Sequence, residues 1–189
     1  MRELLKIALP MVVSQGAFAV MIFTDRYFMS QIDPTHMAAA LGGGVACFFS
    51  FCFFSGLLSY GNAMAAQYLG AGEPEKCPKV VTQGFIMAMM SIPALVVITY
   101  FVSGIFENMG HDPRQVELER TYYIILMLGI VVTLAKICLS SYFAGIARTH
   151  VVMICDVFGL VINVPLSYVM VFGKLGLPAL GIVLSLIHI

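Results

Sequence analysis

Three polar side chains that carry oxygen atoms lie inside long apolar stretches of this sequence. Asp25 lies late in the first stretch, and Asn163 and Ser167 lie late in the fifth. At helical rise, their depths from the nearer helix ends are roughly 10, 15 and 9 Å. Asn163 and Ser167 are four residues apart, which places them on one helix face. An acid, an amide and a hydroxyl at one depth could ligate a hard cation, or the acid could hold a proton.

Each of these residues also has an interpretation without a functional site. Asp25 could pair with its neighbour Arg26, although adjacent helix positions point about 100° apart and Arg26 could reach the surface instead. Asn163 could be an interhelical hydrogen-bonding residue, and Ser167 a packing residue. A charge at the bilayer centre costs about 2.5–3.5 kcal/mol. Because such a cost needs a compensating benefit, a functional role for Asp25 is favoured. The roles of Asn163 and Ser167 stay open.

Lys136 and Asp156 are further charges inside apolar stretches. They lie eleven and nine residues from Ala147, the centre of the hairpin between the fourth and fifth stretches. Their depths are then roughly 16 and 14 Å, so we expect an intramembrane ion pair across the two helices. A structural salt bridge is favoured, because breaking a buried pair leaves one charge uncompensated. A proton relay is the alternative.

The apolar stretches are long enough to cross a membrane, which takes about 20 residues per helix. Because backbone polar groups in lipid need internal partners, such stretches become helices. The sequence predicts an all-α integral membrane protein with five complete transmembrane helices and the start of a sixth, in one transmembrane domain over residues 1–183. The expected helices span about 4–29, 38–69, 80–106, 116–143 and 149–172, with the sixth from 179. Asp33-Pro34 and Asp112-Pro113 are typical of helix N-caps.

Composition supports this class and excludes others. Of 189 residues, 60% are hydrophobic and 11% charged, and the formal net charge is zero. A soluble domain is rarely more than half apolar, so we expect the chain to lie in a lipid bilayer. The balanced charge predicts no basic surface that could bind nucleic acid. The five cysteines lack metal-ligand spacing, and His36, His111 and His150 fall between stretches, where a solvated role is expected. The sequence has no Gly-Lys-Ser/Thr string for ATP, so no cofactor is expected.

Both ends of the chain need an interpretation. Arg2, Lys6 and the small residues near Ala19 resemble a secretory signal, but Pro10 interrupts the apolar stretch and further spans follow, so no cleavage is expected. Residues 184–189 look like a non-native terminal scar and are left out of the fold, so His188 receives no role.

Basic residues between the stretches favour a cytoplasmic N-terminus. The inner side then carries Arg2, Lys6, Lys76, Lys79 and Arg148. The outer side carries Arg114, Arg120 and Lys174, beside Asp33, Glu107, Asp112, Glu117 and Glu119.

Two compositional features favour packing over ligand binding. The triplet Gly42-Gly43-Gly44 is expected to permit close helix approach or a bend. The 13 methionines and 14 phenylalanines could line an adaptable cavity, but plain packing or lipid contact is the favoured interpretation.

Several strings together resemble the multidrug and toxic compound extrusion (MATE) family of efflux transporters. The resemblance covers residues 4–183 and depends on the order and spacing of the strings, each of which is weak alone. The strings are Ala8-Leu9-Pro10, Thr24-Asp25, Ala66 to Gly72, Gly110 to Pro113, Gly145 to Thr149, Asn163 to Tyr168, Phe172-Gly173 and Gly176 to Gly181.

The resemblance implies twelve helices in two six-helix lobes, with this chain as the N-terminal lobe and a C-terminal lobe missing. It implies antiport across the cytoplasmic membrane, in which small organic, often cationic compounds leave as Na⁺ or H⁺ enters. Asp25 and Asn163 match two of the family's site positions. Ser167 stands where the family often has a carboxylate or amide, which leaves the coupling ion open. Asp156 lies seven residues before Asn163 on the same face and could partly replace that acid.

Other classes of function remain alternatives. A lipid-linked precursor flippase of related architecture would need a strongly cationic cavity, and only Arg26, Lys136 and Arg148 could contribute charge. An integral-membrane enzyme would need a cluster of His, Asp or Glu at one membrane face, which the sequence does not suggest. A non-transporting assembly subunit is harder to exclude from the sequence, because a single lobe cannot alternate between inward-facing and outward-facing states.

Overall fold

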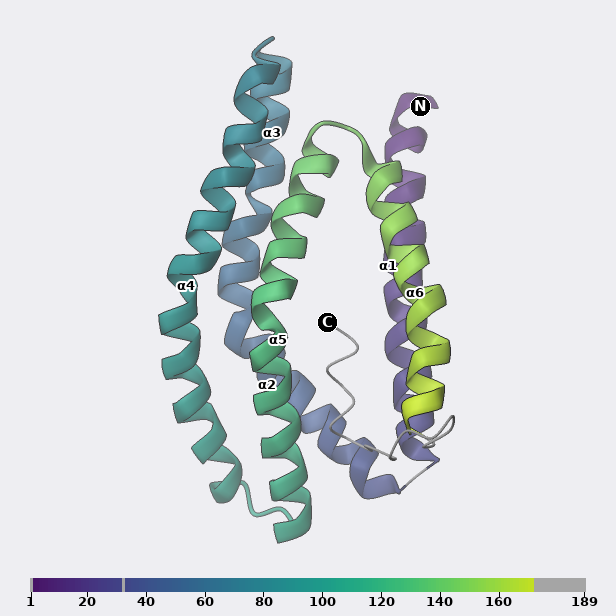
Figure 1. The fold of residues 1–189 in the computed structure, drawn as a ribbon, viewed down its shortest axis with the longest axis vertical. Helices are drawn as coiled ribbons and strands as arrows, with labels where there is room; N and C mark the ends of the chain where they lie inside the picture. The colour runs from purple at the N-terminus through teal and green to yellow at the C-terminus, as the bar shows by residue number, and fades with distance from the viewer. Residues whose placement is uncertain (1, 32, 172–189) are drawn as a thin grey trace.

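The computed structural model describes residues 2–31 and 33–171, and within these ranges the chain is helical without strands. The long helices are α1 (Arg2–Ser30), α2 (Pro34–Ser59), α3 (Gly61–Gly70), α4 (Cys77–Ile105), α5 (Pro113–Gly145) and α6 (Thr149–Val171). Short 3₁₀ turns, η1 (Pro74–Lys76) and η2 (Phe106–Asn108), precede and follow α4. The expected all-α class is confirmed (Figure 1). The expected sixth helix from 179 and the expected scar at 184–189 lie outside the described residues.

Five segments of the described chain are long and apolar enough to cross a membrane, as predicted. They are Leu5–Ser30, Pro34–Gly70, Pro74–Asn108, Pro113–Gly145 and Thr149–Val169. The second segment contains both α2 and α3, which meet at Tyr60. Its 37 residues exceed the length that a hydrocarbon core requires, so one end extends beyond the core or the helix tilts.

Acidic caps set the beginnings of α2 and α5. Asp33 Oδ1 accepts a hydrogen bond from the Thr35 backbone N–H at 2.9 Å, and Asp112 Oδ1 accepts one from the Arg114 N–H at 2.9 Å. In both helices proline follows the cap, where its missing N–H costs no hydrogen bond. These caps begin α2 at residue 34 and α5 at residue 113, a few residues before the start of the apolar stretches.

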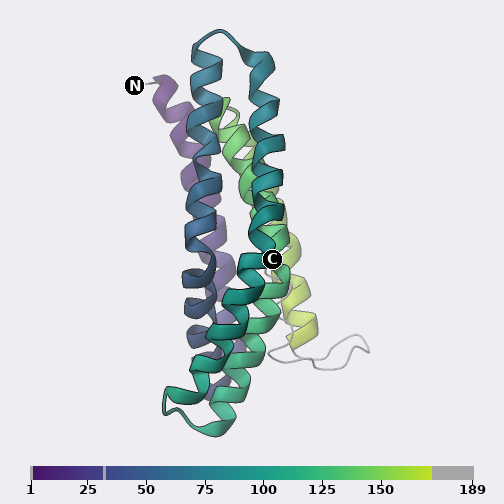
Figure 2. The ribbon, with the colours of Figure 1, turned by 90° about the vertical axis from the view of Figure 1, so that its left-hand side faces the viewer.

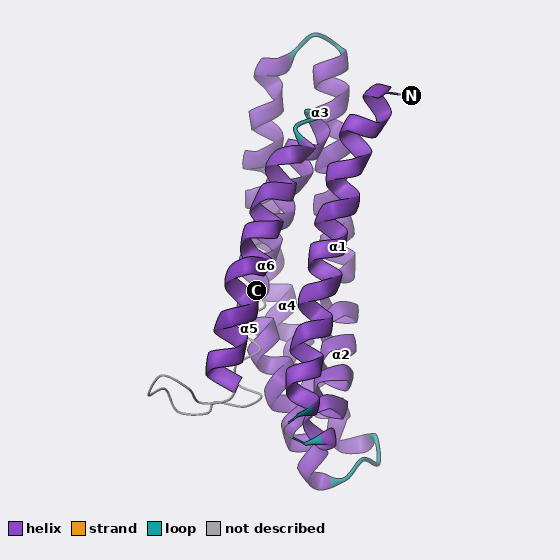
Figure 3. Ribbon diagram, turned by 90° about the vertical axis from the view of Figure 1, so that its right-hand side faces the viewer, coloured by secondary structure: helices purple, strands orange, loops and turns teal. Residues whose placement is uncertain are grey.

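The helices form two groups, which contact each other through α1 with α2 and through α5 with α6. α2, α3 and α4 pack against α5, and α1 packs chiefly against α6 (Figures 1 and 3). α3 and α4 run antiparallel and extend beyond the other helices at one end (Figure 2). The apolar core lies in the first group, where Tyr123 and Leu134 of α5 are fully buried. Burying these side chains stabilises the group formed by α2, α3, α4 and α5. α1 and α6 form a second group with few contacts to the first.

Close contact between α2 and α5 depends on two glycines of the expected triplet. A Cβ at Gly42 would lie 2.8 Å from Glu119 Oε1, and a Cβ at Gly43 would lie 2.9 Å from the Glu119 backbone oxygen. Real Cβ atoms do not approach other atoms this closely, so the prediction of close helix approach is confirmed.

Glu119 is a buried acid of α5, which sequence reasoning had placed on the outer side of the membrane without predicting its burial. Its side chain is 1% exposed. Gln115 Nε2 donates a hydrogen bond to Glu119 Oε1 at 2.8 Å, and His111 Nδ1 lies 3.1 Å from Glu119 Oε2. The carboxylate is therefore retained inside the bundle by two polar partners. His111 thus contacts a buried acid, in addition to lying at the surface as expected.

Candidate functional site

The structure brings Asp25, Asn163 and Ser167 together where α1 packs on α6. The three residues are 7%, 5% and 4% exposed. Ser167 Oγ donates a hydrogen bond to Asn163 Oδ1 at 3.4 Å, and Ser167 also interacts with the Asp25 carboxylate. Carboxylate, carboxamide and hydroxyl oxygens therefore converge at one buried point, which we call the Asp25 cluster.

The Asp25 cluster is buried by the packing of α1 on α6. Phe28 of α1 and Tyr168 of α6 meet edge to face, with ring centroids 5.8 Å apart, next to the cluster. The neighbouring Arg26 is exposed, whereas both oxygens of the Asp25 carboxylate are buried. Asp25 and Arg26 thus lie in different environments, as the difference in direction between adjacent helix positions requires.

A second group of charges lies nearer the α5–α6 hairpin. Lys136 Nζ of α5 lies 2.9 Å from Asp156 Oδ1 of α6. Ser14 of α1 donates a hydrogen bond to the other carboxylate oxygen, Oδ2. The Asp156 side chain is 13% exposed, but half of the Lys136 side chain is exposed. These three residues, the Asp156 cluster, connect α5 to the α1–α6 pair.

Sequence reasoning missed Ser14 and Thr149, which belong to the same helix contact. Thr149 Oγ1 donates a hydrogen bond to the Ile7 backbone oxygen at 3.1 Å. Thr149, Asp156 and Asn163 follow one another at intervals of seven residues, so they share one face of α6. Ser14 lies eleven residues before Asp25, three helical turns away on the same face of α1. This spacing is the signal that could have identified both residues.

A cavity of about 580 Å³ opens beside the Asp156 cluster. Its lining comes from α1, α2, α3, α5 and α6 and includes Lys136, Asp156 and Ser14. Asp25, Asn163 and Ser167 are not among the lining residues. Asp156 and Ser167 are separated by eleven residues, or roughly 16 Å along α6. The structure thus places Asp156 in a cluster of its own, with both carboxylate oxygens engaged.

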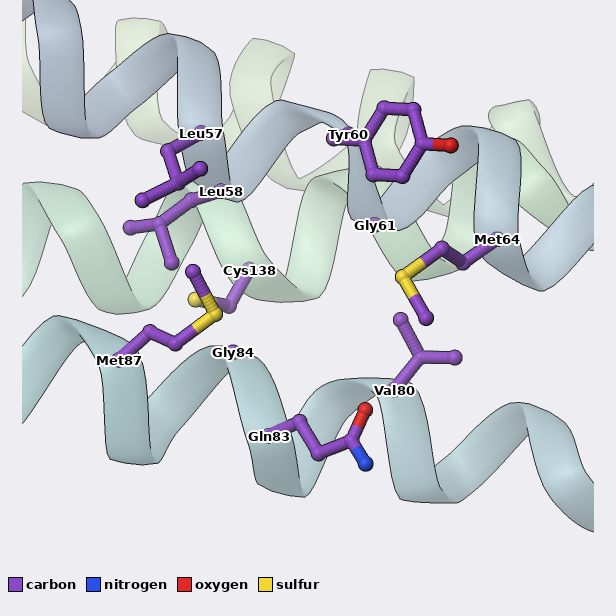
Figure 4. A pocket seen from close by; sticks show the side chains of 10 residues that line it. All are labelled: Leu57, Leu58, Tyr60, Gly61, Met64, Val80, Gln83, Gly84, Met87 and Cys138. Carbon is purple, nitrogen blue, oxygen red and sulfur yellow. The ribbon is translucent and has the colours of Figure 1, made fainter.

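A smaller cavity of about 220 Å³ lies between the α2–α3 junction, α4 and α5. Met64 extends from α3 toward Val80, and Met87 extends from α4 toward Leu58 and Cys138 (Figure 4). Its lining is mostly apolar, with few groups that could orient a ligand. These methionines fill the space between helices, as flexible thioether side chains do.

The chemistry of the Asp25 cluster suits a small cation. Within residues 2–31 and 33–171, no group of three or more His, Cys, Asp or Glu side chains is placed to hold a metal ion. A transition-metal centre of that kind is therefore not formed by the described part of the chain. The cluster instead offers hard oxygen ligands and a single carboxylate, which suits a monovalent cation or a proton.

Comparison with known proteins gives a consistent result. A model of the MatE family matches residues 10–169. Multidrug resistance protein MdtK of Edwardsiella ictaluri is 31% identical over 182 residues, a match that covers 95% of this chain and 40% of that relative. Multidrug resistance protein NorM of Vibrio vulnificus is 30% identical over 179 residues, covering 95% of this chain and 39% of the relative.

The fold matches solved transporter structures as well. A transporter of the MOP superfamily from Pyrococcus furiosus superimposes with a TM-score of 0.81 at 18% identity, covering 98% of this chain and 41% of that chain. The chain therefore spans about two fifths of the length of the proteins it matches. Because the family match extends over most of the sequence and the helices are arranged alike, this chain belongs to the MatE family, the MATE transporters.

Proposed function

We propose that this chain forms the ion-coupling lobe of a secondary active exporter in the cytoplasmic membrane. The exporter moves small organic, often cationic compounds outward in exchange for inward Na⁺ or H⁺. Family membership, five membrane-length helices and relatives described as multidrug resistance proteins support this function. The chain spans about 40% of those relatives, so a second lobe completes the transporter in this proposal.

The observation that carries the proposal is the convergence of Asp25, Asn163 and Ser167 inside the α1–α6 contact. An ionised carboxylate surrounded by apolar helices is costly unless a cation or proton compensates it. When Na⁺ or H⁺ binds Asp25, the negative charge of the carboxylate is neutralised and α1 can repack against α6. When the ion leaves, the charge returns and favours the other packing. Ion and substrate then alter each other's affinity by the same factor, because coupling free energy is reciprocal.

The proposed orientation places the N-terminus in the cytoplasm. The N-terminus, the α3–α4 turn and the α5–α6 hairpin lie at the same end of the molecule (Figure 1). That end carries Lys6, Lys76, Lys79 and Arg148, which supports an inner location by the positive-inside rule. The Asp25 cluster then lies in the outer half of the membrane and the Asp156 cluster in the inner half.

The test is Asp25→Asn in the full-length transporter that contains this chain, reconstituted in proteoliposomes. Export of ethidium is measured with a Na⁺ gradient alone and with a pH gradient alone. The wild type responds to one gradient and thereby identifies the coupling ion, and Asp25→Asn loses that response. Asp33→Asn, which changes a surface acid, serves as the matched control and retains export. Undiminished ion-driven export by Asp25→Asn would refute the proposal.

A further inference from the structure

A groove of about 390 Å³ lies between α4 and α5. α4 is on the side of the molecule away from the α1–α6 pair (Figure 1). The floor of the groove includes the buried residues Leu95 and Ile130, whereas Val96 and Leu128 at its rim are 62% and 71% exposed. Both helices belong to segments that are long and apolar enough to cross a membrane. The groove is therefore open to the surroundings of the protein, which at this depth are lipid.

The groove has the length of one membrane leaflet. Its lining extends from Arg120 to Val131 on α5 and from Ser103 back to Ile92 on α4. Each of these stretches covers eleven residue steps, or roughly 16 Å at helical rise. Half of a hydrocarbon core of about 30 Å has a similar length. An acyl chain that enters at the Arg120 end therefore fits the groove and ends near the middle of the membrane.

An ion pair lies at the mouth of the groove. Arg120 lines the groove, and its Nη1 donates a hydrogen bond to Glu107 Oε1 of η2 at 3.1 Å. The two side chains are 49% and 62% exposed. A guanidinium has several N–H donors and a carboxylate has two oxygens, and the contacts of this pair within the described chain use one of each. The pair thus keeps donors for an anion and an acceptor for a cation, side by side.

We propose that this groove binds phosphatidylethanolamine, with an acyl chain along the floor, the phosphate on Arg120 and the ammonium on Glu107. The headgroup then presents each of its charges to the opposite charge of the ion pair. The planar guanidinium suits a phosphate, and the primary ammonium can donate N–H groups to the carboxylate. In the orientation proposed above, this lipid belongs to the outer leaflet. Its binding does not depend on the transport function.

Other common headgroups complement the pair less well. The ammonium of phosphatidylcholine is fully methylated, so it has no N–H to donate to Glu107. Phosphatidylglycerol has a phosphate but no cation, so Glu107 stays unpaired next to a negative charge. The proposal therefore predicts selectivity for the headgroup, in addition to the general affinity of an apolar groove for acyl chains.

The experiment measures lipid binding to the delipidated full-length transporter that contains this chain, by native mass spectrometry in detergent. Phosphatidylethanolamine, phosphatidylcholine and phosphatidylglycerol are compared, each with oleoyl chains. The first phosphatidylethanolamine should bind about fivefold more tightly than either of the others, as expected for exposed charge pairs. Glycerophosphoethanolamine has the same headgroup without acyl chains and should not displace the lipid at equal concentration. Displacement would show that the acyl chain is not held in the groove and would overturn the proposal.

Two variants test the ion pair separately. Arg120→Gln should weaken the binding of all three lipids and remove the preference for phosphatidylethanolamine. Glu107→Gln should remove the preference over phosphatidylcholine and tighten phosphatidylglycerol binding, because the repelling carboxylate is gone. Arg114→Gln is the matched control, since Arg114 is an exposed arginine of α5 that pairs with Asp33 and does not line the groove. It should bind the three lipids as the wild type does.

A third variant tests the groove and leaves the ion pair intact. Val96→Trp fills the groove from its exposed rim, so the fold should be retained while phosphatidylethanolamine binding falls to the level of phosphatidylcholine. Val97→Trp is the matched control, because Val97 is similarly exposed, at 55%, but is not a lining residue. Equal affinities of the wild type for the three lipids overturn the proposal. A preference that survives both Arg120→Gln and Val96→Trp overturns it as well.

Discussion

Ser14 donates a hydrogen bond to Asp156, and the two residues lie 142 positions apart in the sequence. Thr149 and the Ile7 backbone oxygen have the same separation of 142. A constant separation means that α1 and α6 run parallel and in register along their contact. The pair Asp25 and Ser167 also fits this register. The α1–α6 contact therefore carries polar side chains at matched levels, with the Asp156 cluster at one level and the Asp25 cluster at another.

Ser14→Ala should lower the free energy of unfolding by about 2 kcal/mol, because a hydrogen bond to a charged group contributes about 1.5–3 kcal/mol. Ser59→Ala is the matched control, since Ser59 lines the same cavity but donates only to the Ser55 backbone oxygen of its own helix. Unfolding followed by circular dichroism at 222 nm in detergent measures both. Equal stability of the two variants would contradict a structural role for the Ser14–Asp156 bond.

Ser167→Ala should weaken ion coupling without abolishing it. The Ser167 hydroxyl donates a hydrogen bond to Asn163 Oδ1 and interacts with Asp25, so its loss removes one neutral ligand of the proposed cation. A loss of about 1 kcal/mol corresponds to a several-fold rise in the ion concentration that gives half-maximal export. Maximal export at saturating ion should stay near the wild-type rate.

The control for Ser167→Ala is Ser140→Ala, which removes a hydroxyl from the cavity beside the Asp156 cluster. Its half-maximal ion concentration should match the wild type. If Ser167→Ala also matches the wild type, Ser167 is a packing residue and the cluster consists of Asp25 and Asn163.

Gly43→Ala should destabilise the α2–α5 contact by about 2 kcal/mol. A Cβ at Gly43 would lie 2.9 Å from both the Glu119 backbone oxygen and Tyr122 Cδ1, and the backbone cannot yield cheaply. Overpacking of this kind costs about 1–3 kcal/mol. Gly44→Ala is the matched control, because its Cβ would lie at an ordinary 3.8 Å from Tyr122. Thermal unfolding in detergent should therefore rank Gly43→Ala well below Gly44→Ala, and the reverse order would contradict the observed packing.

Asp33 should contribute a pH-dependent part of the stability. The Thr35 backbone N–H, with a smaller contribution from nearby Arg114, lowers the pKa of Asp33 from its usual 3.8. A folded-state pKa below the unfolded value means that the ionised form stabilises the fold above about pH 3.8. This contribution is lost as the pH falls through the folded pKa.

The measurement for Asp33 compares the wild type with Asp33→Asn from pH 7 down to pH 3 by thermal unfolding. Asparagine can still cap α2, so the variant removes mainly the charge. The wild type should be more stable at pH 5–7, and the difference should shrink progressively as the pH falls below about 3.8. A difference that stays constant over the whole range would show that ionisation of Asp33 does not stabilise the fold.

The sequence by itself determined the helices and the depth of their polar residues. Stretches of this length and apolarity must be helical in lipid, and Asp33-Pro34 and Asp112-Pro113 mark two helix beginnings. Helical rise along a hairpin put Lys136 and Asp156 at similar depths, and the structure places Lys136 Nζ 2.9 Å from Asp156 Oδ1. These inferences needed only local geometry and the cost of charge in lipid.

Only the tertiary structure decided which helix faces meet. Ser14 became a partner of Asp156, and Glu119 entered the core against Gly42, because α1 packs on α6 and α2 packs on α5. In a soluble helix an apolar stripe marks the buried face, but here lipid-facing positions are as apolar as buried ones. The periodicity of apolar residues therefore does not predict which helices are neighbours. Close packing and interhelical hydrogen bonds determine the neighbours instead.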